Sequence, residues 1–394
     1  MLRLWYNKLN MYKMKGMTLV IYLDNAATTK PCKEAVDAVM NGLEHFGNPS
    51  SLHRLGLEAE NLVDKQREII AGAIGAQEKE IFFTSCATES SNTAIFGAYA
   101  YQGKRKHRVV TTTVEHPSVA VPINKLEQLG CEVIRLSPDE NGQISPKAVL
   151  DAVNEDTFLV SMMLVNNETG AVFDVGEAFS MIKKKYPQVL THCDCVQGFM
   201  KLPFTVKKLS ADMISLSGHK VYAPKGIGAL YVKSGVHIPG LLLGGGQENN
   251  FRSGTECVPL ICGFGAAVAA LCGKVEQNYK NAKALQNYLI EKCSETGGVT
   301  VNFASGSPYI TSIAVEGLKS EVLLHFLEEN GIYVSSGSAC SKGKKSSVIK
   351  EFRVPEKLSD SVLRISFSNR TTNDDIDALL EAITRAQGRL ARMK

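Results

Sequence analysis

The sequence lacks several features that would assign it to a particular class of protein. Its ten cysteines include no Cys-x-x-Cys pair and follow no regular spacing, so no disulfide framework is indicated and we expect a reducing compartment, the cytoplasm. No long basic tract interleaved with aromatic residues occurs, and a net charge of +4 is small for 394 residues. We therefore predict no direct nucleic acid binding. Internal repeats and low-complexity segments are also absent, which argues against a repeat architecture.

A membrane anchor and a metal site are not indicated either. The apolar run at residues 17–23 is far shorter than the roughly 20 residues that a spanning helix needs. It has no small-residue cleavage pattern, so we interpret it as a first strand, with residues 1–16 as an N-terminal extension, and we expect no membrane association. His192, Cys193 and Cys195 superficially resemble a metal cluster. Alternation along a strand places the histidine opposite the two cysteines, so we predict no metal site.

The composition is that of a globular protein, with 44% hydrophobic and 21% charged residues. Apolar, often β-branched runs alternate with helical segments. Strands are expected at residues 81–84, 108–111, 132–136, 158–165, 189–193, 213–215 and 228–232, and helices at 58–74, 90–101, 118–129, 146–153 and 175–186. This alternation predicts an α/β fold with a mostly parallel seven-stranded sheet, helices on both faces, and a ligand site at the carboxyl ends of the strands.

After the last of these strands the pattern changes. We expect one long helix at about 260–295, then a mixture of strands and helices that ends with a helix at 376–393. A chain of 394 residues favours two domains. We assign residues 28–275 to a large domain, and residues 17–27 together with 276–394 to a smaller α+β domain, to which the N-terminal strand returns.

Two strand ends carry the clearest chemistry. Ser217-Gly218-His219-Lys220 closes one short apolar run, and Asp194 closes another 26 residues before the lysine. In a parallel sheet this places a lysine amine and a buried carboxylate at the same edge. A lysine can condense with an aldehyde, and a carboxylate can keep a ring nitrogen protonated, which are the two requirements of pyridoxal 5'-phosphate (PLP). The sequence therefore predicts PLP as the cofactor.

A phosphate site is predicted where a strand passes into a helix. Segment 84–92 follows a strand and opens a helix, so the backbone amides at Ala87 and Thr88, with the Thr88 hydroxyl, suit a phosphate. An ordinary Ser/Thr helix cap is the alternative for the same residues. Ser217 and His219 lie beside the lysine and are further donors to that phosphate.

Other polar residues suit a flat ring and an anionic substrate. His116 follows a strand and is a candidate for stacking on a ring, with a structural histidine as the alternative. Gln197, three residues after Asp194, offers an amide to a ring oxygen. Arg364 and Arg252 are candidates for binding a carboxylate. An internal salt bridge is the alternative for Arg364, and a solvated side chain is the alternative for Arg252.

A candidate nucleophile lies far downstream of the lysine. Cys340 is part of Ser336-Gly337-Ser338-Ala339-Cys340-Ser341, a loop of small residues that suits a mobile thiol. A transaminase has no need of such a cysteine. Together with the lysine and the aspartate, Cys340 predicts a PLP enzyme that moves sulfur.

Eight motifs in order, from about residue 20 to the C-terminal part of the chain, resemble those of the cysteine desulfurases (NifS/IscS-like), which are class V aminotransferase-fold enzymes. The match of so many spaced motifs makes chance agreement negligible. They are Leu-Asp-Asn-Ala-Ala-Thr-Thr at 23–29, Phe-Gly-Asn-Pro at 46–49, Ala-Thr-Glu-Ser at 87–90, Glu-His at 115–116, Val-Asn-Asn-Glu-Thr-Gly at 165–170, Ser-Gly-His-Lys at 217–220, Arg-Ser-Gly-Thr at 252–255 and Ser-Gly-Ser-Ala-Cys at 336–340.

The resemblance implies a fold type I PLP homodimer that converts L-cysteine to L-alanine and leaves the sulfur as a persulfide on Cys340. It implies that Lys220 forms the Schiff base with PLP and moves the substrate proton, while His116 stacks on the ring. Arg364, with Asn48 and Asn167, would bind the substrate. The implied cofactor contacts are Ala87, Thr88, Asn167, Asp194, Gln197, Ser217, His219, Lys220 and, from the other subunit, Thr255.

The loop at about 335–350 bears on the subtype. Cys340 precedes Arg364 by 24 residues, which is similar to the long-loop branch that passes sulfur to an acceptor protein for iron-sulfur cluster assembly or tRNA thiolation. In that setting Cys340 is also a candidate transient cluster ligand. The alternative functions are a selenocysteine lyase or another class V PLP enzyme, and a non-catalytic scaffold for sulfur transfer.

Three places depart from the family's usual pattern. Cys86 stands where glycine is usual, which we expect to alter the phosphate turn slightly because a side chain restricts the backbone. Ser91 stands where an acidic or amide residue is usual. The lysine-rich segment 341–345 follows the loop cysteine and is expected to lower the thiol pKa or to contact an acidic partner, with plain surface charge as the alternative.

Overall fold

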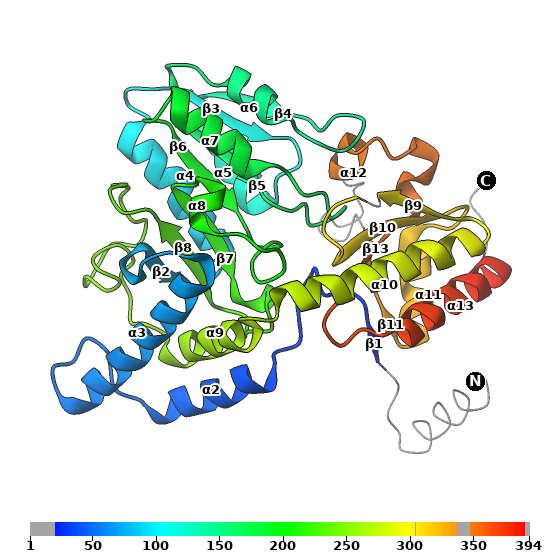
Figure 1. Ribbon diagram of the computed structural model, residues 1–394, viewed down its shortest axis with the longest axis horizontal. Helices are drawn as coiled ribbons and strands as arrows, with labels where there is room; N and C mark the ends of the chain where they lie inside the picture. The colour runs from blue at the N-terminus through cyan, green and yellow to red at the C-terminus, as the bar shows by residue number, and fades with distance from the viewer. Residues whose placement is uncertain (1–19, 304, 337–346, 391–394) are drawn as a thin grey trace. The chain divides into compact units, whose positions relative to one another are not determined.

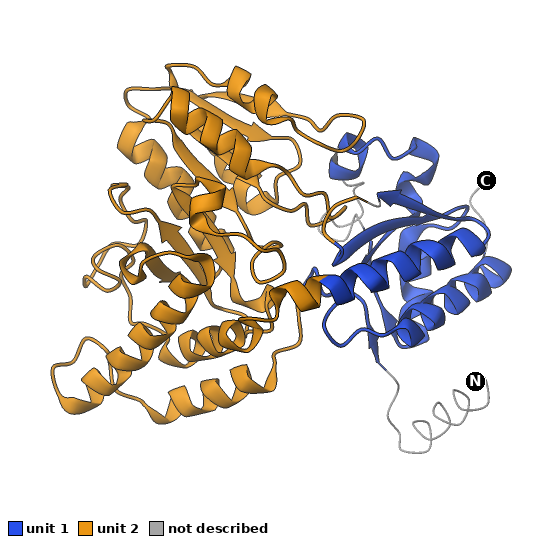
Figure 2. Cartoon of the chain, viewed as in Figure 1, with its two compact units in different colours: residues 1–27, 280–304, 308–394 blue, residues 28–279, 305–307 orange. Residues whose placement is uncertain are grey.

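The computed structural model describes residues 20–303, 305–336 and 347–390 (Figure 1). The chain divides into two compact units (Figure 2). Unit 1 comprises residues 1–27, 280–304 and 308–394, and unit 2 comprises residues 28–279 and 305–307. Cys340 and the lysine-rich segment after it lie outside the described residues.

Unit 2 is built on a seven-stranded sheet, which confirms the predicted fold class. Its order is β2-β8-β7-β6-β5-β3-β4. Only β8 runs antiparallel to its neighbours, and the other pairings are parallel. The strands are β2 (Ile81–Thr84), β3 (Arg108–Thr112), β4 (Glu132–Leu136), β5 (Thr157–Met163), β6 (Leu190–Asp194), β7 (Met213–Ser217) and β8 (Gly228–Val232).

Helices flank this sheet, as the alternation of the sequence predicts (Figure 1). One apolar cluster packs α4 and α5 against the strands, with Ile95, Ile123 and Phe158 fully buried. Burying side chains of this size stabilises the fold by roughly 1.5–3 kcal/mol each. The helices are α2 (Lys33–Glu44), α3 (Arg54–Ile74), α4 (Ala87–Gln102), α5 (Pro117–Gln128), α6 (Pro146–Ala152), α7 (Val175–Lys185), α8 (Val206–Leu209) and α9 (Val258–Leu271), with 3-10 turns η1 (Glu78–Glu80) and η2 (Gly218–Lys220).

The predicted single helix at 260–295 is wrong. Two helices occupy this segment, α9 and α10 (Val275–Glu295), and they are bent by 75°. Cys272 leaves the helical conformation with a ψ of 136°, and Gly273 adopts a left-handed φ of 74°. A left-handed glycine commonly ends a helix because it has no Cβ. In the described part of the chain no single helix is long and apolar enough to cross a membrane, although α9 and α10 together meet that length and composition.

Unit 1 contains a four-stranded antiparallel sheet and a short parallel pair. The sheet order is β12-β13-β10-β9, and β1 (Ile21–Tyr22) pairs in parallel with β11 (Ile332–Tyr333). Its apolar cluster joins the sheet to the last helix. The remaining elements are β9 (Val299–Phe303), β10 (Ile310–Val315), β12 (Ser335–Ser336), β13 (Val362–Ser366), α11 (Ser320–Glu329), α12 (Ser347–Glu351), η4 (Glu356–Ser361) and α13 (Asn373–Arg389).

Candidate active site

The carboxyl ends of five strands in unit 2 meet at one edge of the sheet. The register places Met163, Asp194 and Ser215 side by side on β5, β6 and β7. Thr84 and Ser217, the last residues of β2 and β7, both lie opposite Gly228, the first residue of β8. Because β3 runs parallel to β5, it ends at the same edge. The predicted cofactor residues follow these ends: Ala87 and Thr88 after β2, His116 after β3, Asn167 after β5, Asp194 and Gln197 at β6, and Ser217, His219 and Lys220 at β7.

Lys220 lies in the turn η2 directly after β7 and acts electrostatically on three predicted site residues. Its positive charge lowers the pKa values of Asp194, His116 and His219. Burial is the larger effect: it raises the pKa of Asp194 to about 6 and lowers those of both histidines to about 4. At neutral pH the edge therefore combines a carboxylate and two uncharged imidazoles beside the lysine.

His116 is fixed by the start of helix α5. Its Nδ1 accepts a hydrogen bond from the Ser118 backbone amide at 3.1 Å and lies 2.8 Å from the Ser118 hydroxyl. It is the N-cap of the helix, and Pro117 occupies the first helical position. The ring orientation is thus set before any ligand binds. His116 therefore has a structural role as a helix cap. The capping contacts also hold its neutral ring in a fixed orientation at the strand edge.

The turn between β2 and α4 has the donors that a phosphate requires. The N-cap of α4 is Cys86, and its side chain makes no capping hydrogen bond. The alternative to a phosphate site, an ordinary Ser/Thr helix cap, is therefore not found at this helix N-terminus. The first-turn amides of a 16-residue helix are left for another acceptor. Ser217, only 2% exposed, lies at the end of β7 on the same edge. The donor set fits a phosphate group.

Cys86 does not need the backbone freedom of glycine. Its φ is −174°, which is extended backbone that any residue adopts. The expected alteration of the turn therefore has no backbone cause. The glycine that matters is Gly228 on β8, because a Cβ there would lie 2.8 Å from the Cys86 carbonyl carbon and 3.0 Å from the Ala87 nitrogen. Strand β8 thus packs directly beneath the turn.

The loop that carries the lysine is held by two threonines from the first motif. The Thr29 amide and hydroxyl both donate to the His219 carbonyl oxygen at 2.9 Å. The Thr29 hydroxyl in turn accepts from the Tyr222 amide at 2.7 Å. Thr28 Oγ1 lies 3.2 Å from His219 Nδ1. The motif at 23–29, which had no predicted role, therefore holds the loop that carries Lys220.

The remaining predicted residues of unit 2 differ in exposure. Gln197 is buried, and its side-chain oxygen accepts a hydrogen bond from Lys201 Nζ at 3.0 Å. Asn167 is half-buried in the turn after β5. Asn48 and Thr255 are exposed, and the Asn48 side chain accepts from the Ser50 amide at 3.0 Å.

Arg364 forms the internal salt bridge that was the alternative to substrate binding. It lies on β13 in unit 1, is 8% exposed, and its Nη2 donates to Asp24 Oδ1 at 2.9 Å. Asp24 is held because its neighbours bind Ser366: the Asn25 side chain donates to the Ser366 carbonyl oxygen and the Ala26 amide to its hydroxyl. The pairing leaves the substrate role open, because a guanidinium carries five donors.

Arg252 is not a solvated side chain. Its guanidinium binds Glu89 on the first turn of α4, with Nε to Oε1 at 2.8 Å, and its side chain is 23% exposed. The sequence did not predict this partner.

The sequence predicted that His192, Cys193 and Cys195 do not together form a metal site. The Sγ atoms of Cys193 and Cys195 lie 3.4 Å apart, and His192 bonds instead to Ser161 and Ser215 at 2.8 and 2.9 Å. Among the described residues no group of three His, Cys, Asp or Glu side chains is arranged to hold a metal ion.

Glu115 is a buried acid that the sequence analysis gave no role. Its Oε1 accepts hydrogen bonds from the Thr112 hydroxyl at 2.7 Å and from the Met163 amide at 2.9 Å, so it joins the ends of β3 and β5. Its Oε2 is buried without a hydrogen-bond partner. Burial raises its pKa to about 8, and the negative charge of Asp194 adds to this rise. The Glu-His motif at 115–116 contains this acid, but its contacts depend on the pairing of the strand ends, which a motif does not reveal.

The pKa of Glu115 predicts how stability varies with pH. Between pH 7.5 and 8 much of the folded protein keeps a proton on Glu115 that the unfolded chain, with the usual pKa of 4.5, has already lost. The free energy of unfolding should therefore fall as pH rises, by at most about 1.4 kcal/mol per pH unit. Asp194, with a pKa of about 6, titrates below this window. The buried His116, His192 and His219 oppose the fall, because the unfolded chain protonates them near their usual pKa of 6.5, but this contribution is small above pH 7.5. Urea denaturation of the cofactor-free protein should show this fall, and Glu115→Gln should flatten it. Parallel curves for the two proteins would contradict a neutral Glu115.

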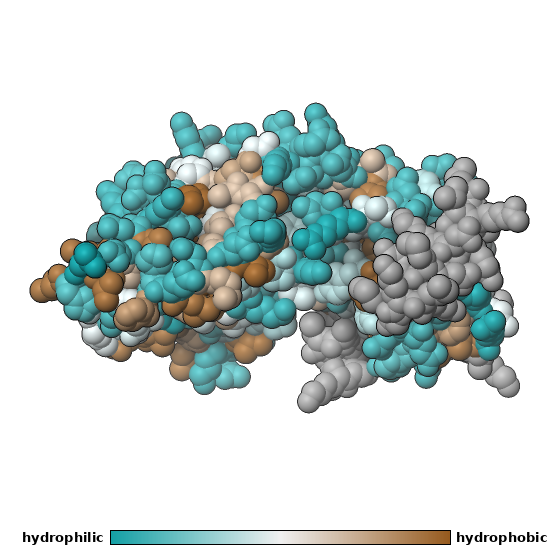
Figure 3. All heavy atoms as spheres, turned by 90° about the horizontal axis from the view of Figure 1, so that it is seen from below, coloured by the Kyte–Doolittle hydropathy of each residue, from teal (hydrophilic) through white to brown (hydrophobic). Residues whose placement is uncertain are grey.

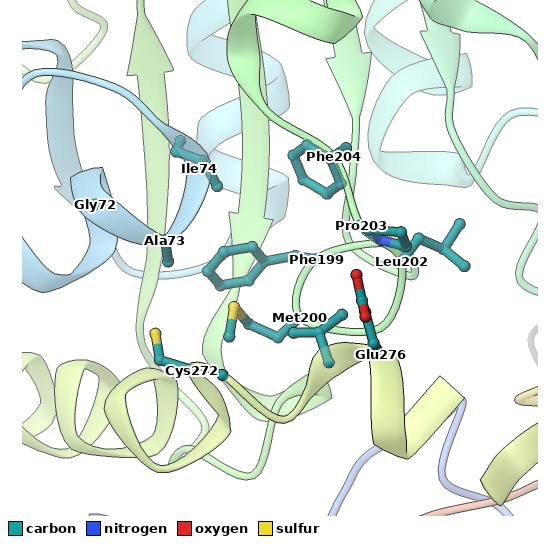
Figure 4. Close-up of a pocket in the computed structure, with 12 residues that line it drawn as sticks. Gly72, Ala73, Ile74, Phe199, Met200, Leu202, Pro203, Phe204, Cys272 and Glu276 are labelled. Atoms are coloured by element: carbon teal, nitrogen blue, oxygen red, sulfur yellow. The ribbon is translucent and has the colours of Figure 1, made fainter. Parts of the chain in front are cut away.

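A cavity of about 420 Å³ lies elsewhere in unit 2 and contains none of the predicted site residues. Figure 4 shows Phe199, Phe204, Cys272 and Glu276 among the residues that line it. Cys272 and Gly273, at the break between α9 and α10, are among its lining residues. The candidate active site is therefore defined by the strand ends and not by this cavity.

Comparison with known proteins agrees with the fold and the site. A sequence profile of the family "Aminotransferase class-V" matches residues 21–379. The cysteine desulfurase IscS of Methanosarcina thermophila is 38% identical over 383 residues, covering 95% of this chain and 93% of that protein. A solved structure described as a NifS-like protein superposes with a TM-score of 0.89 at 33% identity, covering 94% of this chain and 100% of that one. A structure of SspA in complex with cysteine gives a TM-score of 0.78 at 32% identity, covering 88% and 98%.

This chain belongs to the class-V aminotransferase family. Within that family its relatives are cysteine desulfurases of the IscS and NifS type, so the resemblance drawn from the eight motifs is confirmed.

Proposed function

We propose that this enzyme is a PLP-dependent cysteine desulfurase that carries sulfur on Cys340. The observation that carries the proposal is the strand edge of unit 2, where Lys220 acts electrostatically on the buried Asp194 and on the neutral His116. PLP, when bound, supplies an aldehyde for the amine and a ring that withdraws electrons from the substrate carbon. In this proposal Asp194 would pair with the ring nitrogen, His116 would stack on the ring, and the α4 turn with Ser217 and His219 would bind the phosphate.

The protein's own residues divide the remaining work. Lys220 takes the proton from the substrate α-carbon, since a freed lysine amine beside neutral imidazoles is a suitable base. Gln197 and Asn167 would contact the ring oxygen or the substrate, and the resemblance assigns the substrate carboxylate to Arg364 and Asn48. The Cys340 thiolate attacks the substrate sulfur: the bond from Cβ to sulfur breaks, a sulfur–sulfur bond forms, and the carbon fragment is protonated to L-alanine.

The experiment that tests the activity uses the purified full chain with PLP and L-cysteine. We expect equal amounts of L-alanine and of sulfide, the sulfide being released by an added thiol reductant. L-Selenocysteine is the comparison substrate, because the alternative function is a selenocysteine lyase. Alanine formation from selenocysteine but not from cysteine would favour that alternative. Formation of alanine from neither would contradict the proposed function.

The sulfur acceptor and the setting are part of the proposal. We infer that the Cys340 persulfide serves an acceptor protein in iron-sulfur cluster assembly or tRNA thiolation, because the chain between Cys340 and Arg364 is long. The name IscS, carried by a relative, is consistent with this assignment. The cytoplasm is the proposed location. It is supported by the nine described cysteines, which are all free thiols.

A homodimer is proposed because a large apolar surface of unit 2 is exposed. On α2, Val36, Met40 and Leu43 are 48%, 59% and 57% exposed, and their spacing places them on one helix face. Phe46 and Leu52 follow at 81% and 95%. Figure 3 shows apolar side chains gathered on the face that carries α2 and α3. A patch of this kind marks an interaction surface. We assign it to a second copy of the chain, whose Thr255 would complete the phosphate site.

The dimer predicts the effect of a charge on this face. Met40→Glu should raise the dimer dissociation constant by at least about tenfold, because an unpaired carboxylate in an apolar interface costs more than the 1.4 kcal/mol that tenfold represents. Analytical ultracentrifugation measures this. Val121→Glu is the matched control, since Val121 is 61% exposed on α5, away from the patch residues in sequence. Equal dissociation constants for both variants would assign the patch to something other than a second copy.

A further inference from the structure

The segment between β8 and α9 contains an unusual backbone. Glu248, Asn249 and Asn250 have left-handed φ values of 48°, 55° and 64° in succession. Residues other than glycine rarely adopt this conformation, and it persists only where surrounding contacts hold it. The segment ends with Arg252 and the exposed Thr255. Its fixed shape therefore determines where these two side chains are presented.

One buried ion pair holds this segment in place. Glu248 is 5% exposed, and its two carboxylate oxygens each accept a hydrogen bond from Arg67 on α3, both at 2.8 Å. The Glu248 carboxylate also accepts from the Phe83 amide on β2 at 2.7 Å. Arg67 further donates to the Ile81 carbonyl oxygen at 2.8 Å. The segment is thus fixed to β2, the strand that leads into the candidate phosphate turn.

A second ion pair joins the segment to the phosphate turn itself. Arg252 binds Glu89 with Nε to Oε1 at 2.8 Å and Nη2 to Oε2 at 3.3 Å. Glu89 Oε2 also accepts from the Ser85 amide at 2.8 Å, so this carboxylate lies across the turn that precedes α4. The two side chains are 23% and 13% exposed. Burial by itself would raise the pKa of Glu89, but the hydrogen bonds from Arg252 and Ser85 outweigh it and hold this pKa below its usual range, so Glu89 is ionised.

An ionised carboxylate at this position is unfavourable for binding an anion. Ala87 and Thr88, the proposed phosphate ligands, immediately precede Glu89 in the chain. Two negative groups within several ångströms repel each other in a partly buried site. Arg252 cancels the charge of Glu89 without itself lying among the proposed phosphate donors. The Arg67–Glu248 pair holds the segment that carries Arg252 in the position where Arg252 can neutralise Glu89.

We infer that Arg252 is a positioning residue that sets the affinity for the phosphate of the cofactor by neutralising Glu89. This inference rests on the proposed function, because it takes the α4 turn as the phosphate site. It goes beyond that function by assigning a role to an ion pair that is not among the proposed cofactor and substrate contacts. The effect is specific to the phosphate: a ligand with the same ring and aldehyde but no phosphate should not sense it.

The test compares PLP with pyridoxal, which lacks the phosphate. Dissociation constants for both ligands are measured by absorbance titration of the cofactor-free full chain. Arg252→Gln should weaken PLP binding by about tenfold, the effect of one unpaired charge near the site, and should leave pyridoxal binding unchanged. Glu89→Gln should bind PLP at least as tightly as the wild type. The double variant should recover most of the PLP affinity, and Arg252→Lys should retain it.

The controls separate this inference from a structural role. Arg135→Gln removes a guanidinium that pairs with Glu127 at the surface, and it should change neither dissociation constant. Equal weakening of PLP and pyridoxal by Arg252→Gln would overturn the inference and indicate a structural role. A double variant as weak as Arg252→Gln would also overturn it. If the wild type binds pyridoxal and PLP equally, the phosphate site fails, and if it binds neither, the proposed function itself fails.

Discussion

Lys220→Ala should abolish turnover of L-cysteine. The amine lies in the turn after β7, and its charge acts on Asp194 and His116 at the same strand edge. Loss of a residue that both bonds to the cofactor and moves a proton costs about 10²–10⁴-fold for the proton transfer alone. The visible absorbance of the lysine Schiff base should disappear with the activity. Alanine formation at saturating L-cysteine and the absorbance spectrum with PLP are the two measurements.

A second lysine provides the control for this prediction. Lys233 follows β8, is exposed, and lies outside the predicted site. Lys233→Ala should keep wild-type turnover and colour. Wild-type alanine formation by Lys220→Ala would show that another amine performs the chemistry. Loss of activity in both variants would instead indicate damage to the fold.

Cys340→Ser should reduce sulfide release from L-cysteine to the uncatalysed background while PLP stays bound. A hydroxyl is a far weaker nucleophile than a thiolate near neutral pH, so the bond to the substrate sulfur is not attacked. The absorbance of the cofactor should be unchanged, because Lys220 is still present. Sulfide is assayed colorimetrically with an added thiol reductant, and the spectrum is recorded on the same sample.

Exposed cysteines elsewhere in the chain are the matched controls. Cys257 and Cys272 are both exposed, and replacing either by serine should leave sulfide release unchanged. Full sulfide release by Cys340→Ser would overturn the persulfide mechanism. Sulfide release that requires Cys272 instead would move the nucleophile to a different part of the chain.

The sequence predicted the sheet because each strand carries its own local signal. β2, β4 and β8 begin and end where their apolar runs do. It failed at the helix after the sheet, because the apolar pattern continues through the break at Cys272 and Gly273 and only the left-handed backbone ends α9. The periodicity of apolar residues indicates which helix face is buried. It does not indicate whether that face belongs to one helix or to two.

The candidate site was predictable where residues follow strand ends, as Asp194 and Lys220 do. It was not predictable where pairing is between distant segments. Glu89 with Arg252, Arg67 with Glu248 and Asp24 with Arg364 are 163, 181 and 340 residues apart. A buried arginine needs an acidic partner, and the sequence can indicate that need. Only the fold shows which aspartate or glutamate is the partner.

The most direct test of the central claim is the mass of the protein after one turnover. The PLP-loaded protein is mixed with one equivalent of L-cysteine, alkylated without reductant and digested. The account predicts one additional sulfur atom on the peptide that contains Cys340, together with one equivalent of L-alanine. Alanine without added sulfur on that peptide, or a sulfur found on another cysteine, would contradict it.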